Sequence, residues 1–99
     1  MKLTENQLRF LRGKAHPLHP LVMIGQSGLT DAVCAETERA LTDHELIKVR
    51  VRSAERSQRE SIIDALAQRT GAVLVTRIGH VAVIYRPRQP LPRLVLPDR

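Results

Sequence analysis

The apolar run at residues 21–24 constrains the fold of this chain more than any other feature of its sequence. Pro20 and Gly25 bound the run, and four apolar residues between such breakers predict a strand buried on both faces. Segments with helical spacing flank this run, and strands joined through helices are expected to pair in parallel by right-handed crossovers. The chain should therefore fold around a sheet that contains parallel strands.

Capping signals mark the starts of three helices. Thr4 and Gln7 stand at the spacing of a capping box, and the helix that they begin should end near residue 15 or 16, ahead of a proline. Thr30 is a good N-cap for a second helix that should run to residue 41 or 42. Ser57 and Glu60 predict a third capping box.

The remaining segments predict three more strands. Residues 46–52 alternate in polarity, and two further runs, 72–78 and 81–86, follow Gly71, which stands where a left-handed helix terminator belongs. Gly79 and His80 form a two-residue loop typical of a type II′ hairpin. The expected fold is α/β: a mixed four-stranded sheet packed with helices, in the order α-β-α-β-α-β-β. Residues 1–87 should form one domain, and residues 88–99 a flexible tail rich in Pro and Arg.

The charge balance predicts a polyanionic partner. The chain has 99 residues, a formal net charge of +6 and a sequence pI near 10.7. Its aromatic residues are Phe10 and Tyr85 alone. Single-strand binders of the RRM and OB type stack bases on several exposed aromatics, so these designs are excluded.

Cysteine and histidine usage gives no sign of a metal or redox site. The single cysteine, Cys34, excludes an intramolecular disulfide and a cysteine zinc site, and it favours a reducing cytoplasm. The start of the chain predicts no signal peptide, and no apolar run is long enough to cross a membrane. His16 and His19 have a spacing that a metal could use, but Pro17 breaks the helix that would aim both rings. No nucleophile–base set or carboxylate pair stands out, so we expect no enzyme and no cofactor.

The strongest candidate for a binding site is the loop Gly25-Gln26-Ser27-Gly28. A glycine at each end lets a phosphate approach the backbone, and the following helix start adds free N–H groups and a partial positive charge. In KH domains a GxxG loop clamps the nucleic-acid backbone in this way. The alternative interpretation is an ordinary turn between a strand and a helix.

Basic residues form the second candidate. One group shares a face of a predicted strand and consists of Lys48, Arg50 and Arg52. The other lies on the first predicted helix and just after it, and consists of Arg12, Lys14 and His16. Each could be an ordinary solvated charge, but together they fit the excess of a nucleic-acid binder. Acidic residues on and after the second helix, Glu45 included, are expected to face away from the ligand.

Four features of the sequence together resemble a known family. One is the Arg-rich start of the third helix, and the others are three segments. They are LRGKAHPLHPLVMIGQSGLT (11–30), HELIKVRV (44–51) and TGAVLVTRIGHVAVIYRP (70–87). They are similar to YhbY-like proteins, the bacterial stand-alone form of the CRM domain (chloroplast RNA splicing and ribosome maturation). The resemblance implies an RNA-binding fold like the C-terminal domain of translation initiation factor 3, and association with precursors of the large ribosomal subunit. It places the family's loop on residues 25–28, flanked by Lys14, His16, Lys48 and Arg50.

The resulting hypothesis is a cytoplasmic, monomeric RNA-binding protein that assists assembly of the large ribosomal subunit. Its expected partner is large-subunit ribosomal RNA or its precursor particle. Phosphate contacts do not distinguish RNA from DNA, so a DNA or nucleoid binder is one alternative. A basic adaptor that meets an acidic protein on the ribosome is the other.

Overall fold

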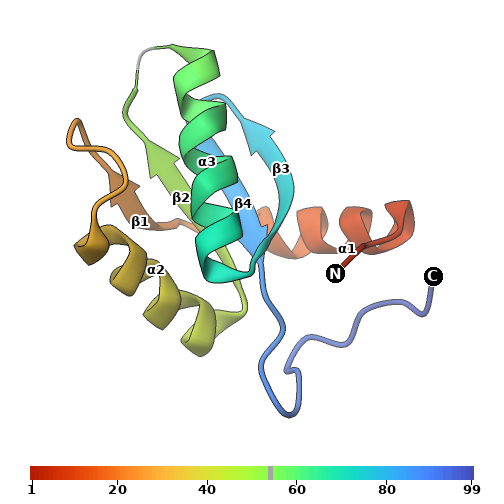
Figure 1. Ribbon diagram of the computed structural model, residues 1–99. Helices are drawn as coiled ribbons and strands as arrows, with labels where there is room; N and C mark the ends of the chain where they lie inside the picture. The colour runs from red at the N-terminus through yellow and green to blue at the C-terminus, as the bar shows by residue number, and fades with distance from the viewer. Residues whose placement is uncertain (54) are drawn as a thin grey trace.

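The computed structural model describes residues 1–53 and 55–99, and its elements follow the predicted order (Figure 1). In chain order they are α1 (Glu5–Ala15), β1 (Pro20–Ile24), α2 (Asp31–His44), β2 (Leu46–Val51), α3 (Arg56–Thr70), β3 (Val73–Ile78) and β4 (Val81–Tyr85). The strands form one mixed four-stranded sheet on which the helices pack. The predicted α/β fold class is therefore confirmed.

The strands are arranged in the order β1-β2-β4-β3. β1 pairs with β2 in parallel, as the helix between them predicts, and β4 pairs antiparallel with both β2 and β3. The expectation that all helix-joined strands pair directly is wrong for β2 and β3, because β4 lies between them. β4 is buried along almost its whole length, whereas β3 ends in the exposed residues Arg77 and Ile78. The more apolar strand therefore takes the central place, and β3 is left at an edge.

β1 is the other edge strand, and the prediction that it is buried on both faces is wrong. Val22 and Ile24 are buried, but Leu21 and Met23 on the opposite face are 50% and 53% exposed. Side chains alternate between the faces of a strand, so one face of β1 is covered and the other is open. α1, which shares the open side, packs against β2 and β3.

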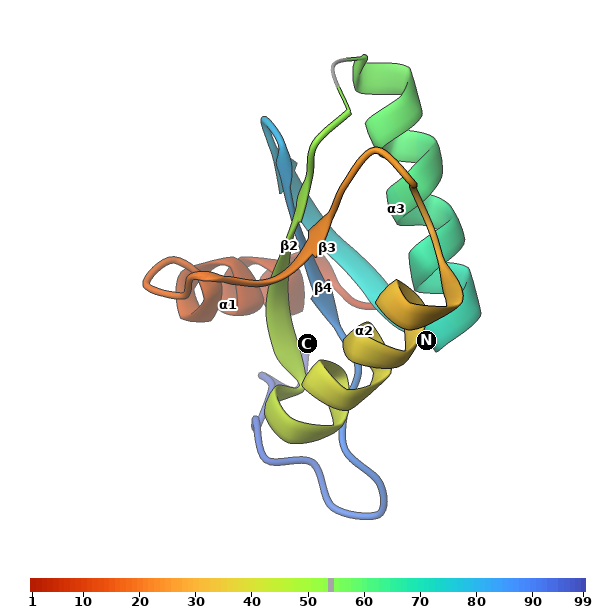
Figure 2. The same ribbon diagram turned by 90° about the vertical axis from the view of Figure 1, so that its left-hand side faces the viewer.

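The helices cover the two faces of the sheet unequally. α2 and α3 lie on one face, and α1 lies on the other (Figure 2). The larger core lies under α2 and α3; its largest members include Ile24, Leu41, Ile47, Ile63, Leu66 and Ile84. A smaller core lies under α1 and is formed by Leu11, Ala15, Leu46, Val75, Val83 and Tyr85.

Most of the helix-end predictions are confirmed. The hydroxyl of Thr4 accepts a hydrogen bond from the Gln7 N–H, and the Gln7 side chain accepts one from the Thr4 N–H, which completes the capping box. The Thr30 hydroxyl accepts from the Val33 N–H, although α2 runs two residues further than expected, to His44. The box predicted at Ser57 is wrong: the N-cap of α3 is Glu55, two residues earlier, so the serine lies inside the helix.

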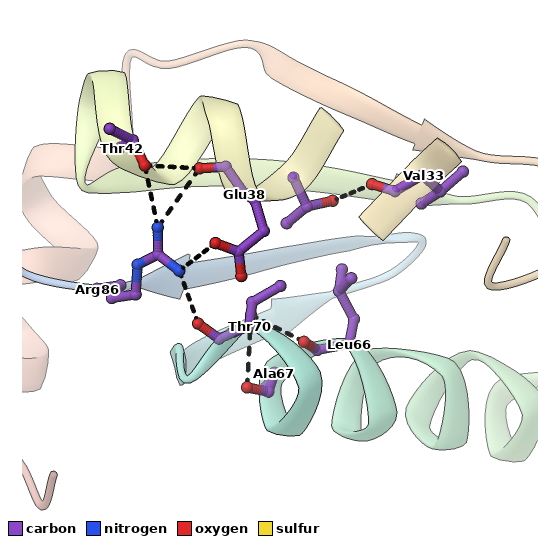
Figure 3. Close-up of polar contacts among 8 residues, drawn as sticks. Val33, Glu38, Thr42, Leu66, Ala67, Thr70 and Arg86 are labelled. Atoms are coloured by element: carbon purple, nitrogen blue, oxygen red, sulfur yellow. Dashed lines mark hydrogen bonds and ion pairs between the residues drawn. The ribbon is translucent and has the colours of Figure 1, made fainter. Parts of the chain in front are cut away.

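Arg86, just after β4, ties the sheet to the ends of α2 and α3 (Figure 3). Its guanidinium donates to the Thr70 carbonyl and the Glu38 carboxylate at 2.8 Å each, and to the Thr42 hydroxyl at 3.2 Å. The last carbonyls of a helix lack partners within it, and Arg supplies a fork of donors that can reach several at once. One side chain thus satisfies groups on both helices.

Glu45, between α2 and β2, holds the segment that follows β4. Its buried carboxylate accepts hydrogen bonds from the backbone N–H groups of Arg88, Arg93 and Leu94, all within 3.0 Å. Burial by itself would raise the pKa of Glu45, but these three donors and the charge of Arg93 outweigh it and hold the pKa below its ordinary value. We expected Glu45 to face away from the ligand together with the acidic residues of α2, but unlike them it is buried inside the domain.

Residues 88–99, predicted as a flexible tail, contain no helix or strand. Besides the bonds to Glu45, the Gln7 side chain donates to the Pro97 carbonyl at 2.8 Å, and Leu94 and Leu96 pack on the core under α1. The sequence analysis did not predict these contacts, which hold the C-terminal segment against the rest of the domain.

Candidate nucleic-acid interface

Residues 25–28 form a tight turn at the carboxyl end of β1, which we call the glycine turn. The Gly28 N–H donates to the Gly25 carbonyl at 3.1 Å, and the Gly28 carbonyl accepts from the Thr30 N–H at the same distance. Gly28 has a φ of +70°, in the left-handed region that L side chains rarely adopt. The turn is mostly exposed and leads into the N-terminus of α2 (Figure 2).

The backbone of the glycine turn offers donors to an anion. Within the described residues, the N–H groups of Gln26 and Ser27 donate to no backbone or side-chain acceptor. The positive end of α2 lies next to them, although the Thr30 hydroxyl and the Asp31 carboxylate already complement that end. Two free N–H groups in a turn that leads into a helix are suited to binding a phosphate oxygen.

Gly25 is not required by the fold. Its φ lies outside the left-handed region, and a Cβ built on it meets no heavy atom within 4 Å. A larger residue could therefore stand there without strain. A glycine whose side-chain space is open to the outside leaves room for the backbone of a ligand to approach.

Lys48 has a structural task that the sequence analysis missed. Its Nζ donates to the main-chain carbonyl of His16 at 3.3 Å and to that of Leu18 at 3.0 Å. The ammonium has three donors, so one remains for a ligand. Lys48 thus fastens the connection between α1 and β1 to the sheet.

Arg50 and Arg52 follow along β2. Arg50 is exposed and pairs in register with Met23 of β1 and Val81 of β4. The backbone N–H of Arg52 donates to the Ile24 carbonyl at 2.9 Å, which joins the end of β2 to the residue before the glycine turn. Of the predicted cations, Arg52 is therefore tied directly to the base of the turn.

The predicted cations of α1 lie on the other side of the sheet from α2 and α3 (Figure 2). Lys14 Nζ lies 5.5 Å from the centre of the Phe10 ring, and Arg12 forms an ion pair with Glu5 at 3.1 Å. His16 is exposed at the end of α1. The predicted site residues thus fall into two groups, one at the glycine turn and one on the face that β2 shares with α1.

We call this second surface the open sheet face. Its hollow, about 260 Å³, is lined by Pro20, Lys48, Arg50, Ile78, Val81 and Val83. Ile78 is 70% exposed, and the half-exposed Leu21 and Met23 share this side of β1. The open sheet face is therefore both apolar and cationic, which the sequence analysis did not foresee because it expected β1 to be covered on both sides.

A groove between α3 and β3 carries further cations. It has a volume of about 650 Å³, and Arg56, Arg59 and Arg77 line it together with Glu60. Arg77 pairs with Asp64 at 2.7 Å, and Arg59 donates to the Ser53 carbonyl at 2.9 Å. The sequence analysis did not select Arg77 as a site residue, although a basic residue near the end of a predicted strand was a reason to consider it.

Residues 1–53 and 55–99 contain neither a candidate metal cluster nor a candidate membrane span. No group of three or more His, Cys, Asp and Glu side chains in this part of the chain could hold a metal ion. No helix there is long and apolar enough to span a bilayer.

The fold and the glycine turn define a small basic α/β domain with a backbone-donor loop at the end of an edge strand. The model of the CRS1/YhbY (CRM) domain family matches residues 3–86. A Haemophilus influenzae protein named RNA-binding protein is 49% identical over 87 residues, which is 88% of each chain. The Bacillus subtilis Probable RNA-binding protein YqeI is 35% identical over 95 residues, 96% of this chain and 99% of the relative.

A solved structure shares the fold. The solution structure of the hypothetical protein SAV1595 from Staphylococcus aureus superposes with a TM-score of 0.84 at 32% identity, covering 97% of this chain and all of that one. The chain therefore belongs to the CRS1/YhbY (CRM) domain family, and the resemblance found in the sequence is confirmed.

Proposed function

We propose that this chain is an RNA-binding protein that acts in assembly of the large ribosomal subunit. In this proposal the glycine turn holds the RNA backbone. The observation that carries it is the open space at Gly25. The fold would accept a larger residue there, and the space that glycine leaves lies beside two free N–H groups. The names of the relatives from Haemophilus influenzae and Bacillus subtilis support RNA as the ligand.

The chemistry of the turn suits a phosphate. The N–H groups of Gln26 and Ser27 would donate to phosphate oxygens, and Gly25 would admit the sugar–phosphate chain without a clash. Arg52, tied to the base of the turn, would add long-range attraction. Such contacts read the shape and charge of the backbone, so we expect recognition of RNA structure rather than of base sequence.

The basic residues on the far side of the sheet would extend the contact. Arg50 and the third donor of Lys48 face outwards on the open sheet face, and Arg12, Lys14 and His16 lie on α1 beside it. RNA that reached both groups would pass around the edge formed by β1. Charge reversal at Arg50 tests this path: a weakened affinity with a reduced salt slope supports it, and an unchanged slope opposes it.

The ribosomal part of the proposal follows from the resemblance to YhbY-like proteins. Its test is sedimentation of a cell lysate through a sucrose gradient, with crosslink mapping of the RNA that the protein contacts. We expect the protein in fractions that hold large-subunit precursors, crosslinked to their ribosomal RNA. Sedimentation as free protein at low salt would contradict this assignment.

The DNA alternative is tested by competition. RNA and DNA of matched sequence and structure compete for the protein, and the proposal expects RNA to win. Preference for DNA would replace the ribosomal assignment with a nucleoid-binding one.

One observation on the open sheet face favours the adaptor alternative. Leu21, Met23 and Ile78 expose large apolar side chains on the open sheet face, and exposed apolar patches often mark protein contacts. Ribosome association that survives nuclease digestion of exposed RNA, and is lost on Met23→Asp, would support protein docking there. Release by nuclease would favour RNA as the sole attachment.

A further inference from the structure

A groove lies between the glycine turn and the first half of α3. Its volume is about 510 Å³, within the range of small-ligand sites and large enough for a nucleotide unit. Gly25 and Gly28 form one wall, and the other lining residues are Gln26, Ser53, Ser57, Gln58, Ser61 and Ile62. We call it the serine groove.

The lining of the serine groove is polar but uncharged. It contains three hydroxyls and two amides over the apolar side chain of Ile62. The groove on the far side of α3 is different, since Arg56, Arg59 and Arg77 line it. Neutral hydroxyls and amides can bond a sugar hydroxyl or a base edge, whereas the arginines of the other groove would bind a phosphate more strongly.

The hydroxyls are available to a ligand. Ser53 is the exception among the three, because its hydroxyl donates to the side-chain oxygen of Gln58 at 2.6 Å. Among residues 1–53 and 55–99, the hydroxyls of Ser57 and Ser61 have no hydrogen-bond partner. They are one helical turn apart, so both stand on the side of α3 that faces the glycine turn.

We propose that the serine groove distinguishes ribose from deoxyribose, with Ser57 and Ser61 bonding a 2′-hydroxyl of the bound strand. This inference rests on the proposed function, because the glycine turn must hold the neighbouring phosphate. A 2′-hydroxyl both donates and accepts a hydrogen bond, and so does a serine hydroxyl. A sugar without that group would leave two hydroxyls unpaired beneath the strand.

The experiment measures affinity of the full chain for a short labelled RNA hairpin and for the same hairpin with 2′-fluoro sugars. The fluoro sugar keeps the A-form helix but has no hydroxyl to donate, so helix shape is held constant. We expect the unmodified protein to prefer the hydroxyl form about tenfold, the effect of one to two hydrogen bonds. The double variant Ser57→Ala/Ser61→Ala should lose this preference and keep its salt slope.

The variants separate the groove from the rest of the interface. Both serines are exposed positions within a helix, where alanine is well tolerated, and circular dichroism checks the fold. Gln68→Ala, at an exposed position of α3 outside the groove, is the matched control and should keep the preference. Equal affinity of the unmodified protein for the two hairpins, or a preference that survives the double variant, overturns the inference alone. Failure to bind either hairpin overturns the proposed function as well.

Discussion

The carboxylate of Glu45 bonds the backbone N–H of Arg93 through both of its oxygens, at 3.0 and 2.9 Å, across 48 positions of sequence. Two further N–H groups complete its shell, and the carboxylate is fully buried. A residue between a helix and a strand thus holds the segment after the last strand. This contact, like other positions with a defined structural role, can be tested by substitution.

Glu45→Gln should destabilise the fold. The amide keeps the shape of the side chain, but its NH₂ group would face backbone N–H donors and leave some of them unpaired. Hydrogen bonds to a charged group contribute about 1.5–3 kcal/mol, so we expect a loss of about 2 kcal/mol in the free energy of unfolding. Denaturant titration of both proteins measures it. Equal midpoints and slopes would contradict the role assigned to Glu45.

Acid should weaken the same contact. The pKa of Glu45 is lower in the folded protein than its ordinary value of 4.5, so the unfolded chain binds more protons near pH 4. The stability that Glu45 contributes is therefore complete above about pH 4.5 and is lost as the pH falls through the lowered pKa. Unfolding measured from pH 7 to pH 3 should show this loss, and Glu45→Gln should show a smaller one. Parallel pH profiles for the two proteins would exclude Glu45 as its source.

Arg86→Lys should cost more stability than a surface exchange of the same kind. A single ammonium cannot reach the Thr70 carbonyl, the Glu38 carboxylate and the Thr42 hydroxyl together, as the guanidinium does. The side chain is about a quarter exposed, so we expect a moderate loss of about 1–2 kcal/mol.

The matched control for Arg86 is Arg77→Lys. The Arg77 side chain is more exposed, and within residues 1–53 and 55–99 it pairs with Asp64 alone, so its exchange should change stability by less than about 1 kcal/mol. Thermal unfolding of the two variants compares them. Equal shifts would mean that the links from Arg86 to α2 and α3 contribute nothing beyond an ordinary ion pair.

Gly13→Ala should stabilise the protein. Gly13 lies inside α1, its φ is outside the left-handed region, and an added Cβ meets nothing within 4 Å. Alanine in a helix interior is better than glycine by about 0.5–1 kcal/mol. Gly71→Ala is the counterpart, since Gly71 ends α3 at a φ of +71° and the exchange should destabilise by about 1–2 kcal/mol. A rise in melting temperature for both, or for neither, would contradict the distinction.

The sequence predicted the elements well because their signals are local. Thr4, Thr30 and Gly71 act through residues three to five positions away, so the pattern around each is sufficient to place a helix end. The position of β4 between β2 and β3 depends on which strand is apolar on both faces, a comparison across the whole sheet. Leu21 and Met23 look like core residues in the sequence, and the place of β1 at the edge makes them surface residues.

The candidate site was predictable in part for the same reason. Glycine spacing and the Thr30 cap placed the turn correctly between β1 and α2. The bonds from Lys48 to the chain near His16, and the placing of Ser57 and Ser61 opposite the turn, join residues about 30 positions apart. Such contacts follow from the packed fold and leave no local pattern in the sequence.

The central claim is that the glycine turn holds the RNA backbone, and paired charge substitutions test it most directly. Gly25→Asp and Gln68→Glu each lower the net charge by one at an exposed position, and Gly25 has open Cβ space and no left-handed φ. Filter binding to a large-subunit ribosomal RNA transcript over a range of salt measures affinity and slope. We expect Gly25→Asp to weaken binding about tenfold or more and to reduce the slope by about one phosphate contact, with Gln68→Glu close to the unmodified protein. Two folded variants that bind alike, with the slope of the unmodified protein, would contradict the claim.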